Sequence, residues 1–249
     1  MNIETKLKSL RLSGVAQVLP VRNQEAIHAK LSYTDFLELL VDDELARRKG
    51  RLLERRRQLA HFPAFKTLDS FDWDFNPKIN RRQIADLATC RYVPIGENVL
   101  FLGHPGVGKS HLAIALGMQA IRCAYSVRYY SAYDFIEALA DAELGGLRRQ
   151  FVAELARVNL LIIDELGMKK LPPSAGEDLL EIVIQRYEKA ATIITSNRPM
   201  EDWGKILADN ATATAILDRL LHHAHVIQIT GKSYRLAKRT TLEANEETK

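Results

Sequence analysis

The middle of the chain carries the run Gly103-His104-Pro105-Gly106-Val107-Gly108-Lys109-Ser110. This run fits the pattern G-x-x-x-x-G-K-[ST], in which glycines let the backbone curl and turn its N–H groups toward phosphates. Lys109 is expected to reach the β- and γ-phosphates of a nucleotide, and the Ser110 hydroxyl is expected to ligate Mg²⁺. We therefore predict that this run and the adjacent His111 bind the phosphates of ATP.

The residues on either side of this run favour a phosphate-binding loop over a chance glycine-rich turn. Residues 98–102 predict a short buried strand, and residues 111–120 predict a helix. Strand, loop and helix in this order form the context that the motif requires. The positive end of the helix dipole then faces the same phosphates.

A second motif lies downstream, where residues 159–165 form an apolar run that ends in Asp164 and Glu165. Such a run is typical of a strand buried on both faces of a parallel sheet. We expect Asp164 to hold the hydration shell of Mg²⁺ opposite Ser110, and Glu165 to orient or deprotonate the attacking water. Because a small-molecule kinase needs no such second acid, the pair favours hydrolysis of ATP over phosphate transfer to a metabolite.

A third apolar run, residues 191–199, ends in polar side chains that include Asn197. Ligands of open α/β sheets lie at the carboxyl ends of the strands. Asn197 is therefore expected to lie between the two sites above and to bond the γ-phosphate or the water. The alternative is a simple strand-to-turn transition, since Asn-x-Pro clusters often mark turns.

The rest of the chain alternates between helical and strand patterns. We expect strands over residues 126–130 and 225–229, and helices over residues 77–89, 132–140, 177–190 and 213–224. Residues 145–151 predict a flexible basic loop. Residues 67–75 predict a linker whose Phe71 and Phe75 either pack into the nucleotide-binding domain or cover the adenine. Alternating strands and helices indicate an α/β fold with a parallel sheet flanked by helices.

Composition limits the remaining choices. The chain has 249 residues, of which 47% are hydrophobic and 27% are charged, values that are ordinary for a globular protein. Cys90 and Cys123 lack metal-ligand spacing and favour a reducing compartment over a disulfide framework. No apolar run reaches the roughly 18 residues of a membrane helix, and the first residues lack a secretory pattern. We expect a cytoplasmic protein without a membrane partner.

Positive charge is concentrated in the first quarter of the chain. Residues 1–66 carry a net charge of +5 and the remainder carries −1. Seven cations against one acid within residues 47–57 exceed what a solvated helical face usually shows, and such a cluster is the footprint of a phosphate-backbone binder. The residues predicted to contact DNA are Arg47, Arg48, Lys49, Arg51, Arg55, Arg56 and Arg57, with Arg148, Arg149, Lys169 and Lys170 as further candidates.

The first quarter is also expected to be helical. A helix over residues 5–18 is predicted to break near Gly14, and Ser32-Tyr-Thr-Asp35 resembles a capping box before a long helix in which Gly50 introduces a kink. We expect a small helical domain over residues 1–66, a nucleotide-binding domain over residues 67–239, and a polar, disordered tail over residues 240–249.

Together the motifs resemble the IstB-like AAA+ ATPases that assist transposases. The motifs that carry the resemblance, in order and spacing, are Gly103–Ser110, Leu160–Glu165, Thr195–Pro199, Ile216–Leu220 and Gly231–Arg235. The resemblance covers nearly the whole chain and implies a P-loop AAA+ domain preceded by a small helical domain. Two departures from the family pattern are His104 in the loop and Met168-Lys169-Lys170 after the second acid, and the latter puts that loop's contacts in doubt.

The resemblance implies further roles and partners. Arg219 resembles the arginine finger that enters a neighbouring subunit's site, and Arg235 resembles the sensor arginine that touches the γ-phosphate from its own chain. A ring or helical oligomer on duplex DNA, acting with a partner transposase, is the function implied. A helicase loader of the DnaC type and a non-catalytic DNA-binding module are alternatives. His222, His223 and His225 do not share one helix face, so no metal site is expected there.

Overall fold

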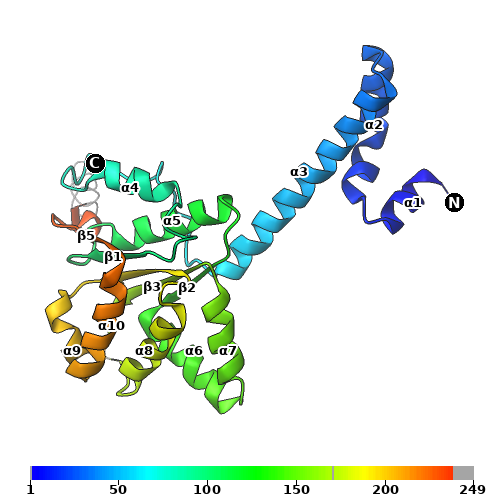
Figure 1. Cartoon of the computed structure of the whole chain (residues 1–249). Helices are drawn as coiled ribbons and strands as arrows, with labels where there is room; N and C mark the ends of the chain where they lie inside the picture. The colour runs from blue at the N-terminus through cyan, green and yellow to red at the C-terminus, as the bar shows by residue number, and fades with distance from the viewer. Residues whose placement is uncertain (1, 170, 238–249) are drawn as a thin grey trace, which may run out of the picture. The chain divides into compact units, whose positions relative to one another are not determined.

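The computed structural model describes residues 2–169 and 171–237, which fall into two compact units, one ending at Arg56 and one beginning at Arg57. All five strands belong to the second unit (Figure 1). The expected domain boundary after residue 66 stays a prediction. Lys170 and the polar tail at 240–249 lie outside the described residues.

The N-terminal unit is helical, with α1 (Ile3–Ser9), α2 (Ser13–Ala29) and most of α3 (Tyr33–Ala60). The predicted capping box is confirmed, because the Asp35 N–H donates to Ser32 Oγ at 3.2 Å and Ser32 N–H donates back to Asp35 Oδ2 at 3.3 Å. The helix α3 then continues through Gly50 without interruption.

The predicted break near Gly14 is confirmed, because α1 ends at Ser9 and α2 begins at Ser13, although Gly14 itself lies in the first turn of α2. The N–H groups of Gly14 and Val15 donate to the buried Oε2 of Glu44 at 2.6 and 3.2 Å. A Cβ at Gly14 would lie 2.5 Å from that oxygen. The glycine therefore permits a close approach between α2 and α3 and does not end a helix.

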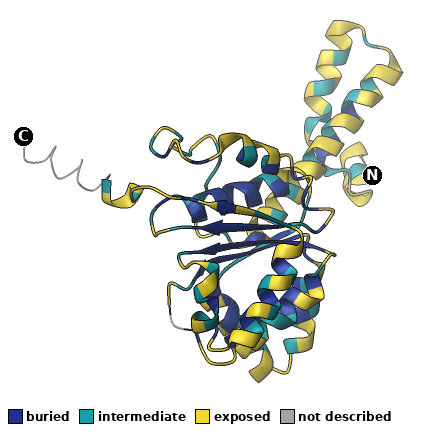
Figure 2. Ribbon diagram, turned by 60° about the vertical axis from the view of Figure 1, so that its left-hand side comes forward, coloured by how far each residue is buried: buried dark blue, intermediate teal, exposed yellow. Residues whose placement is uncertain are grey.

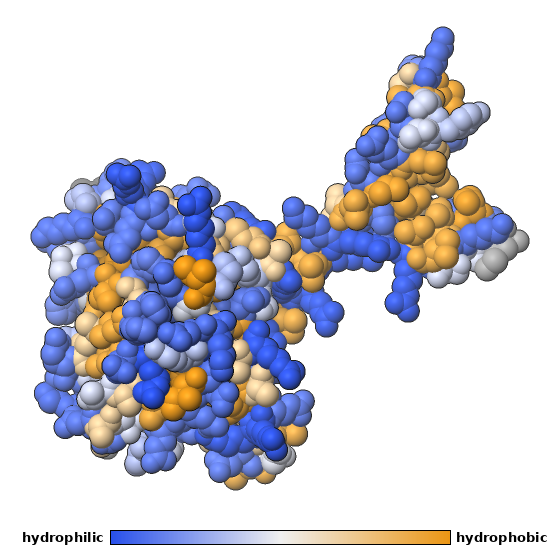
Figure 3. Space-filling view, in the orientation of Figure 1, coloured by the Kyte–Doolittle hydropathy of each residue, from blue (hydrophilic) through white to orange (hydrophobic). Residues whose placement is uncertain are grey.

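The N-terminal unit leaves many large apolar side chains exposed, visible as patches of high hydropathy in Figure 3. On α3 they recur along one face at Tyr33, Leu37, Val41 and Leu45, which are 92, 60, 54 and 59% exposed. Exposed apolar surface of this kind is typical of an interaction site.

The second unit is built on a five-stranded sheet in which every paired strand is parallel. Its strands are β1 (Asn98–Leu102), β2 (Val127–Ser131), β3 (Leu160–Leu166), β4 (Ala191–Ser196) and β5 (Ala224–Gln228), in the order β2-β3-β4-β1-β5. The three central strands are almost entirely buried (Figure 2), as their apolar runs predicted. The expected α/β fold with a parallel sheet is confirmed.

Helices cover both faces of this sheet (Figure 1). One face carries α4 (Arg81–Ala88) and α5 (Lys109–Arg122). The other carries α6 (Ala132–Leu144), α7 (Arg148–Arg157), α8 (Ala175–Arg186) and α10 (Asn210–His222), with the short η1 (Met200–Asp202) and α9 (Trp203–Ile206) beside them. None of the described helices is both long and apolar enough to cross a membrane.

The expected flexible basic loop at residues 145–151 is wrong in its extent. The helix α7 already begins at Arg148. The Arg148 guanidinium donates to Asp178 at 3.0 Å and to Glu181 at 2.5 Å, so acids on α8 fix the first turn of α7. The expected helix at 77–89 begins later than predicted, at Arg81, with Asn80 as its N-cap.

Arg186 is a cation inside the core, only 2% exposed. Its guanidinium donates to the carbonyls of Leu155 at 2.5 Å and Val158 at 2.8 Å, to that of Ala191, and to Thr192 Oγ1 at 3.1 Å. Burial lowers the pKa of Arg186 to about 9, which leaves it charged at neutral pH. Arg186 thus joins the end of α7 to the start of β4.

We expect Arg186→Met to destabilise the second unit by at least about 3 kcal/mol. Three buried carbonyls lose their donor, at roughly 1 kcal/mol or more each. Urea unfolding followed by the fluorescence of Trp203, which is fully buried in this unit, measures the loss. Arg157→Met, at an exposed arginine of α7, is the matched control and should leave the unfolding midpoint unchanged.

Candidate functional site

The loop between β1 and α5 is shaped by glycines. Gly103 and Gly108 have φ values of 150° and 106°, in the region that favours glycine. A Cβ at Gly103 would collide with the carbonyl oxygen of Ile229, and a Cβ at Gly108 would lie 2.7 Å from the ring of Phe71. Neither position accepts a side chain, and α5 begins directly afterwards at Lys109.

Lys109 lies across this loop and is 7% exposed. Its Nζ donates to the carbonyls of Gly103 at 2.7 Å and His104 at 2.9 Å. Burial lowers the pKa of Lys109, the charge of Asp164 opposes this effect, and Arg235 adds to it. No carboxylate of the described chain forms an ion pair with Lys109. The ammonium group therefore fits the role of an anion ligand.

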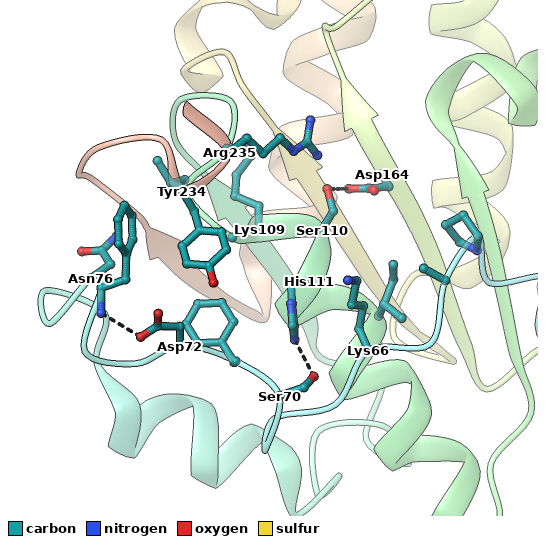
Figure 4. Close-up of a pocket in the computed structure, with 18 of the residues that line it drawn as sticks. Lys66, Ser70, Asp72, Asn76, Lys109, Ser110, His111, Asp164, Tyr234 and Arg235 are labelled. Carbon is teal, nitrogen blue, oxygen red and sulfur yellow. Dashed lines mark hydrogen bonds between the residues drawn. The ribbon is translucent and has the colours of Figure 1, made fainter. Parts of the chain in front are cut away.

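The carboxylate of Asp164, 1% exposed, accepts hydrogen bonds from three hydroxyls. Ser110 Oγ donates to Oδ1 at 2.9 Å, and Thr195 Oγ1 donates to the same oxygen. The Tyr129 hydroxyl donates to Oδ2 at 2.6 Å. Ser110 and Asp164, predicted as a magnesium pair, are thus in direct contact (Figure 4). Hydroxyl and carboxylate oxygens are the ligands that Mg²⁺ takes in proteins, so the set fits that ion.

Tyr129 and Thr195 were not predicted. They reach Asp164 from the two strands that flank β3, and the only sequence signal was a polar atom near the end of each strand. Burial raises the pKa of Tyr129, and the charge of Asp164 raises it further, so the Tyr129 hydroxyl stays protonated as a donor.

Glu165 lies at an irregularity of β3, where the register with β4 shifts between Ile163 and Leu166. Its φ is 62°, an uncommon conformation for a residue other than glycine, and its N–H donates to Thr195 Oγ1 at 3.0 Å. Both Asp164 and Glu165 line the same cavity, although they are adjacent on one strand. The bulge accounts for this, since side chains of a regular strand alternate between faces.

The cavity has a volume of about 510 Å³ and lies between the glycine loop and the segment at residues 63–76 (Figure 4). Residues 106–111 line it, together with Asp164, Glu165, Tyr234 and Arg235. The His111 ring bonds the Thr67 carbonyl at 2.9 Å and Ser70 Oγ at 3.3 Å, which fixes this segment to α5.

Aromatic rings form one side of the cavity. Phe71 packs edge-on against His111 at 5.1 Å between centroids, and Phe75 packs edge-on against Tyr234 at 4.9 Å. Both phenylalanines line the cavity, as a linker laid against the nucleotide-binding domain would. Contact with adenine stays a prediction.

Several predicted site residues do not line this cavity of the described chain. Gly103, His104 and Pro105 are not among its lining residues, although the first two contribute carbonyls to Lys109. The Asn197 amide, oriented to satisfy its neighbours, donates to the carbonyls of Leu166 and Gly167. Arg219 donates to the carbonyl of Ala215 in its own helix at 2.9 Å.

The predicted DNA-contact residues differ in their surroundings. Arg47 donates to Ser13 O and to Gln17, and Arg48 donates to Glu44 at 2.7 Å, so both are bound within the N-terminal unit. Lys169 lies over the Tyr133 ring at 4.5 Å. Among the predicted DNA-contact residues, those that are exposed and form no ion pair with another described residue are Lys49, Arg51, Arg55, Arg149 and Lys169.

The three histidines near the end of α10 separate into two groups. His225 contacts Glu97 at 2.9 Å, whereas His222 and His223 lie 3.5 Å from Glu188, and the ligand atoms of this second group lie within 4.8 Å of one another. The His223 carbonyl accepts from Asn98 N–H at the start of β1. This exposed group therefore lies where β1 begins, at the end of the sheet opposite the cavity.

Comparison with solved structures supports the fold. The DnaC helicase loader matches with a TM-score of 0.52 and 21% sequence identity, over 64% of this chain and 98% of that chain. DnaI matches with a TM-score of 0.55 and 21% identity, over 71% of this chain and 92% of that chain. These matches agree with the expected α/β fold, a parallel sheet flanked by helices.

Comparison with known sequences is more specific. A protein of insertion sequence IS5376 from Geobacillus stearothermophilus, named for ATP binding, is 37% identical over 95% of this chain and 94% of its own length. The corresponding protein of insertion sequence IS21 from Pseudomonas aeruginosa is 36% identical over 95% of this chain and 89% of its own length. The family model described as IstB-like ATP binding protein matches residues 5–242. The glycine loop, the Ser110–Asp164 pair and these matches agree, and the chain belongs to the family of IstB-like ATP-binding proteins.

Proposed function

We propose that this protein is a magnesium-dependent ATPase that assembles on duplex DNA and assists a partner transposase. The observation that carries the proposal is the meeting of Ser110, Asp164 and Glu165 beside Lys109 and Arg235 in one cavity. A site that only binds nucleotide does not need a second carboxylate, that of Glu165, next to Asp164, which is proposed to hold Mg²⁺. Family membership supports ATP as the ligand.

The proposed hydrolysis assigns a task to each group. Lys109 binds the β- and γ-phosphates, and Ser110 and Asp164 hold Mg²⁺, which supplies charge to the phosphate oxygens when bound. Glu165, presented by the bulge of β3, orients the attacking water and accepts its proton. Arg235 lines the cavity from the segment after β5 and contacts the γ-phosphate of its own chain.

The position of Arg219 supports self-assembly. Arg219 does not line the cavity of its own chain, as far as the structure describes it. An arginine finger that enters a neighbour's site would have this placement. The apolar patches of the N-terminal unit offer additional surface for contacts between copies, without fixing how many copies assemble.

DNA binding is assigned chiefly to Lys49, Arg51 and Arg55. They are exposed on α3, whereas the guanidinium groups of Arg47 and Arg48 are bonded to Gln17 and Glu44 of the same unit. Phosphate contacts from cations of this kind would fix the protein on the duplex backbone without reading sequence.

The assignment to transposition rests on the relatives, which are named as proteins of insertion sequences. A helicase loader is the alternative, since DnaC shares the fold at 21% identity. Stimulation of ATP turnover by duplex DNA beyond that by single strands supports the first function. A preference for single strands, together with binding to a replicative helicase, would support the loader.

Glu165→Gln should reduce ATP turnover by about 100-fold or more, because the amide cannot accept the proton of water. ATP binding should be retained, since the phosphate ligands are intact. Lys109→Ala should instead weaken ATP binding by roughly tenfold to a hundredfold. Steady-state turnover and equilibrium nucleotide binding separate the two effects. Unchanged turnover in Glu165→Gln would remove that residue from the reaction.

Reversal of Lys49, Arg51 and Arg55 to Glu should weaken duplex binding and flatten its dependence on salt. Each lost phosphate contact lowers the slope of log affinity against log salt by about 0.9. Fluorescence anisotropy of a labelled duplex over a salt series measures both quantities.

A charge-matched control reverses three exposed cations of the second unit, Arg82, Arg122 and Lys189. It changes the net charge of the protein by the same amount. If the control weakens binding as much as the test variant does, net charge accounts for the effect and α3 is not the DNA-binding surface.

Arg219→Ala should bind ATP normally and lose about 10³-fold in turnover, because the finger acts on a neighbour's nucleotide. Mixing it with Glu165→Gln should restore part of the activity at interfaces that pair an intact Glu165 with an intact Arg219. Turnover of the mixture is compared with that of each variant alone. Full activity of Arg219→Ala would exclude the finger assignment.

A further inference from the structure

The last turn of α3 is bound by Arg128 of β2. Arg128 Nη1 donates to the carbonyl of Leu59 at 2.8 Å, while its Nη2 contacts Glu154 at 2.5 Å. The final carbonyls of a helix have no partner within the helix and favour a cation. Arg128 therefore holds the C-terminal end of α3 against the edge strand of the sheet.

Phe62, which follows α3, packs between β2 and α5. Its ring centroid lies 6.0 Å from that of Tyr129. On its other side, a Cβ at Gly117 of α5 would lie 2.8 Å from Phe62 Cζ, so the helix has a glycine where the ring approaches. A displacement of the end of α3 would thus press on the Tyr129 ring, because close-packed side chains transmit such shifts.

Tyr129 connects this packing to the nucleotide site. Its hydroxyl donates to Asp164 Oδ2 at 2.6 Å, while Ser110 and Thr195 donate to Oδ1. Tyr129 is the one described residue that bonds Oδ2. The hydroxyl therefore sets the rotation of the carboxylate and decides how Oδ1 faces Ser110.

We propose that Tyr129 is a positioning residue for Asp164, and that Arg128, Phe62 and Tyr129 together couple the end of α3 to the magnesium acid. This inference rests on the proposed function, in which Asp164 serves Mg²⁺ and α3 binds DNA. Occupation of α3 by DNA then alters how strongly Mg²⁺ promotes ATP binding. The three side chains of this route lie in the second unit, whereas the DNA-contact residues lie earlier in α3, in the first unit.

The positioning role is tested by binding, without turnover. The affinity for a fluorescent ATP analogue is measured with Mg²⁺ and with EDTA, and the ratio gives the gain due to the metal. Tyr129→Phe should lower this gain roughly tenfold, the value of one hydrogen bond to a charged group, and leave the EDTA affinity unchanged.

Tyr130→Phe is the matched control, since Tyr130 is the next residue of the strand and packs against Phe135 and Phe151 on the other face. It should keep the full gain. A full gain in Tyr129→Phe, or an equal loss in both variants, would overturn the positioning role. Absence of ATP turnover in the wild type would contradict the proposed ATPase and leave this binding test intact.

The coupling is tested by measuring the same ratio of affinities, with Mg²⁺ and with EDTA, in the absence and in the presence of a 30-base-pair duplex. The duplex concentration is about tenfold above its Kd. In the wild type, DNA should change the metal gain by at least about fivefold. Arg128→Gln should bind DNA normally and lose this effect, because Leu59 is released. Glu154→Gln, which removes the negative charge of the other partner of Arg128, is the control and should keep the DNA effect. A DNA effect that survives in Arg128→Gln, or is absent from the wild type, would overturn the coupling.

Discussion

The buried carboxylate of Asp164 constrains the rest of the second unit. A carboxylate that is 1% exposed is costly unless donors replace its water. Here the donors come from α5, β2 and β4, so three separate elements must arrive at one point. Their arrival fixes the position of β3 between β2 and β4, because a shift of one residue would turn the acid to the other face.

The same requirement accounts for the irregular end of β3. Two adjacent acids must both face the cavity, which a regular strand does not allow. The bulge after Asp164 and the positive φ of Glu165 solve this at some cost in backbone strain, and the bond from the Glu165 N–H to Thr195 Oγ1 stabilises the result. Thr195 therefore supports both acids at once, through a single hydroxyl.

The sequence predicted features that depend on local patterns. Apolar runs located the strands to within a residue or two, and the glycine loop and Asp164-Glu165 were found because their residue types are adjacent in the chain. Tyr129 was missed because its role comes from a contact across two strands. The break near Gly14 was found from the local pattern, whereas the close approach of Glu44 to this glycine was not, because it is a contact between residues thirty positions apart. The start of α7 was misplaced because acids on α8, thirty residues away, stabilise Arg148.

Several polar groups of the site are already bonded within the protein itself. Lys109 donates to two loop carbonyls, Ser110 donates to Asp164, and Asp164 holds Tyr129. Nucleotide and metal must therefore exchange these bonds for their own, and the affinity of the site reflects the difference between two sets of bonds. A small change in the geometry of one internal bond then changes affinity without touching the nucleotide. Because the Tyr129 ring also packs against Phe62, the residue that follows the last turn of α3 by two positions, the proposed coupling needs only a small shift of this ring to change the affinity of the nucleotide site.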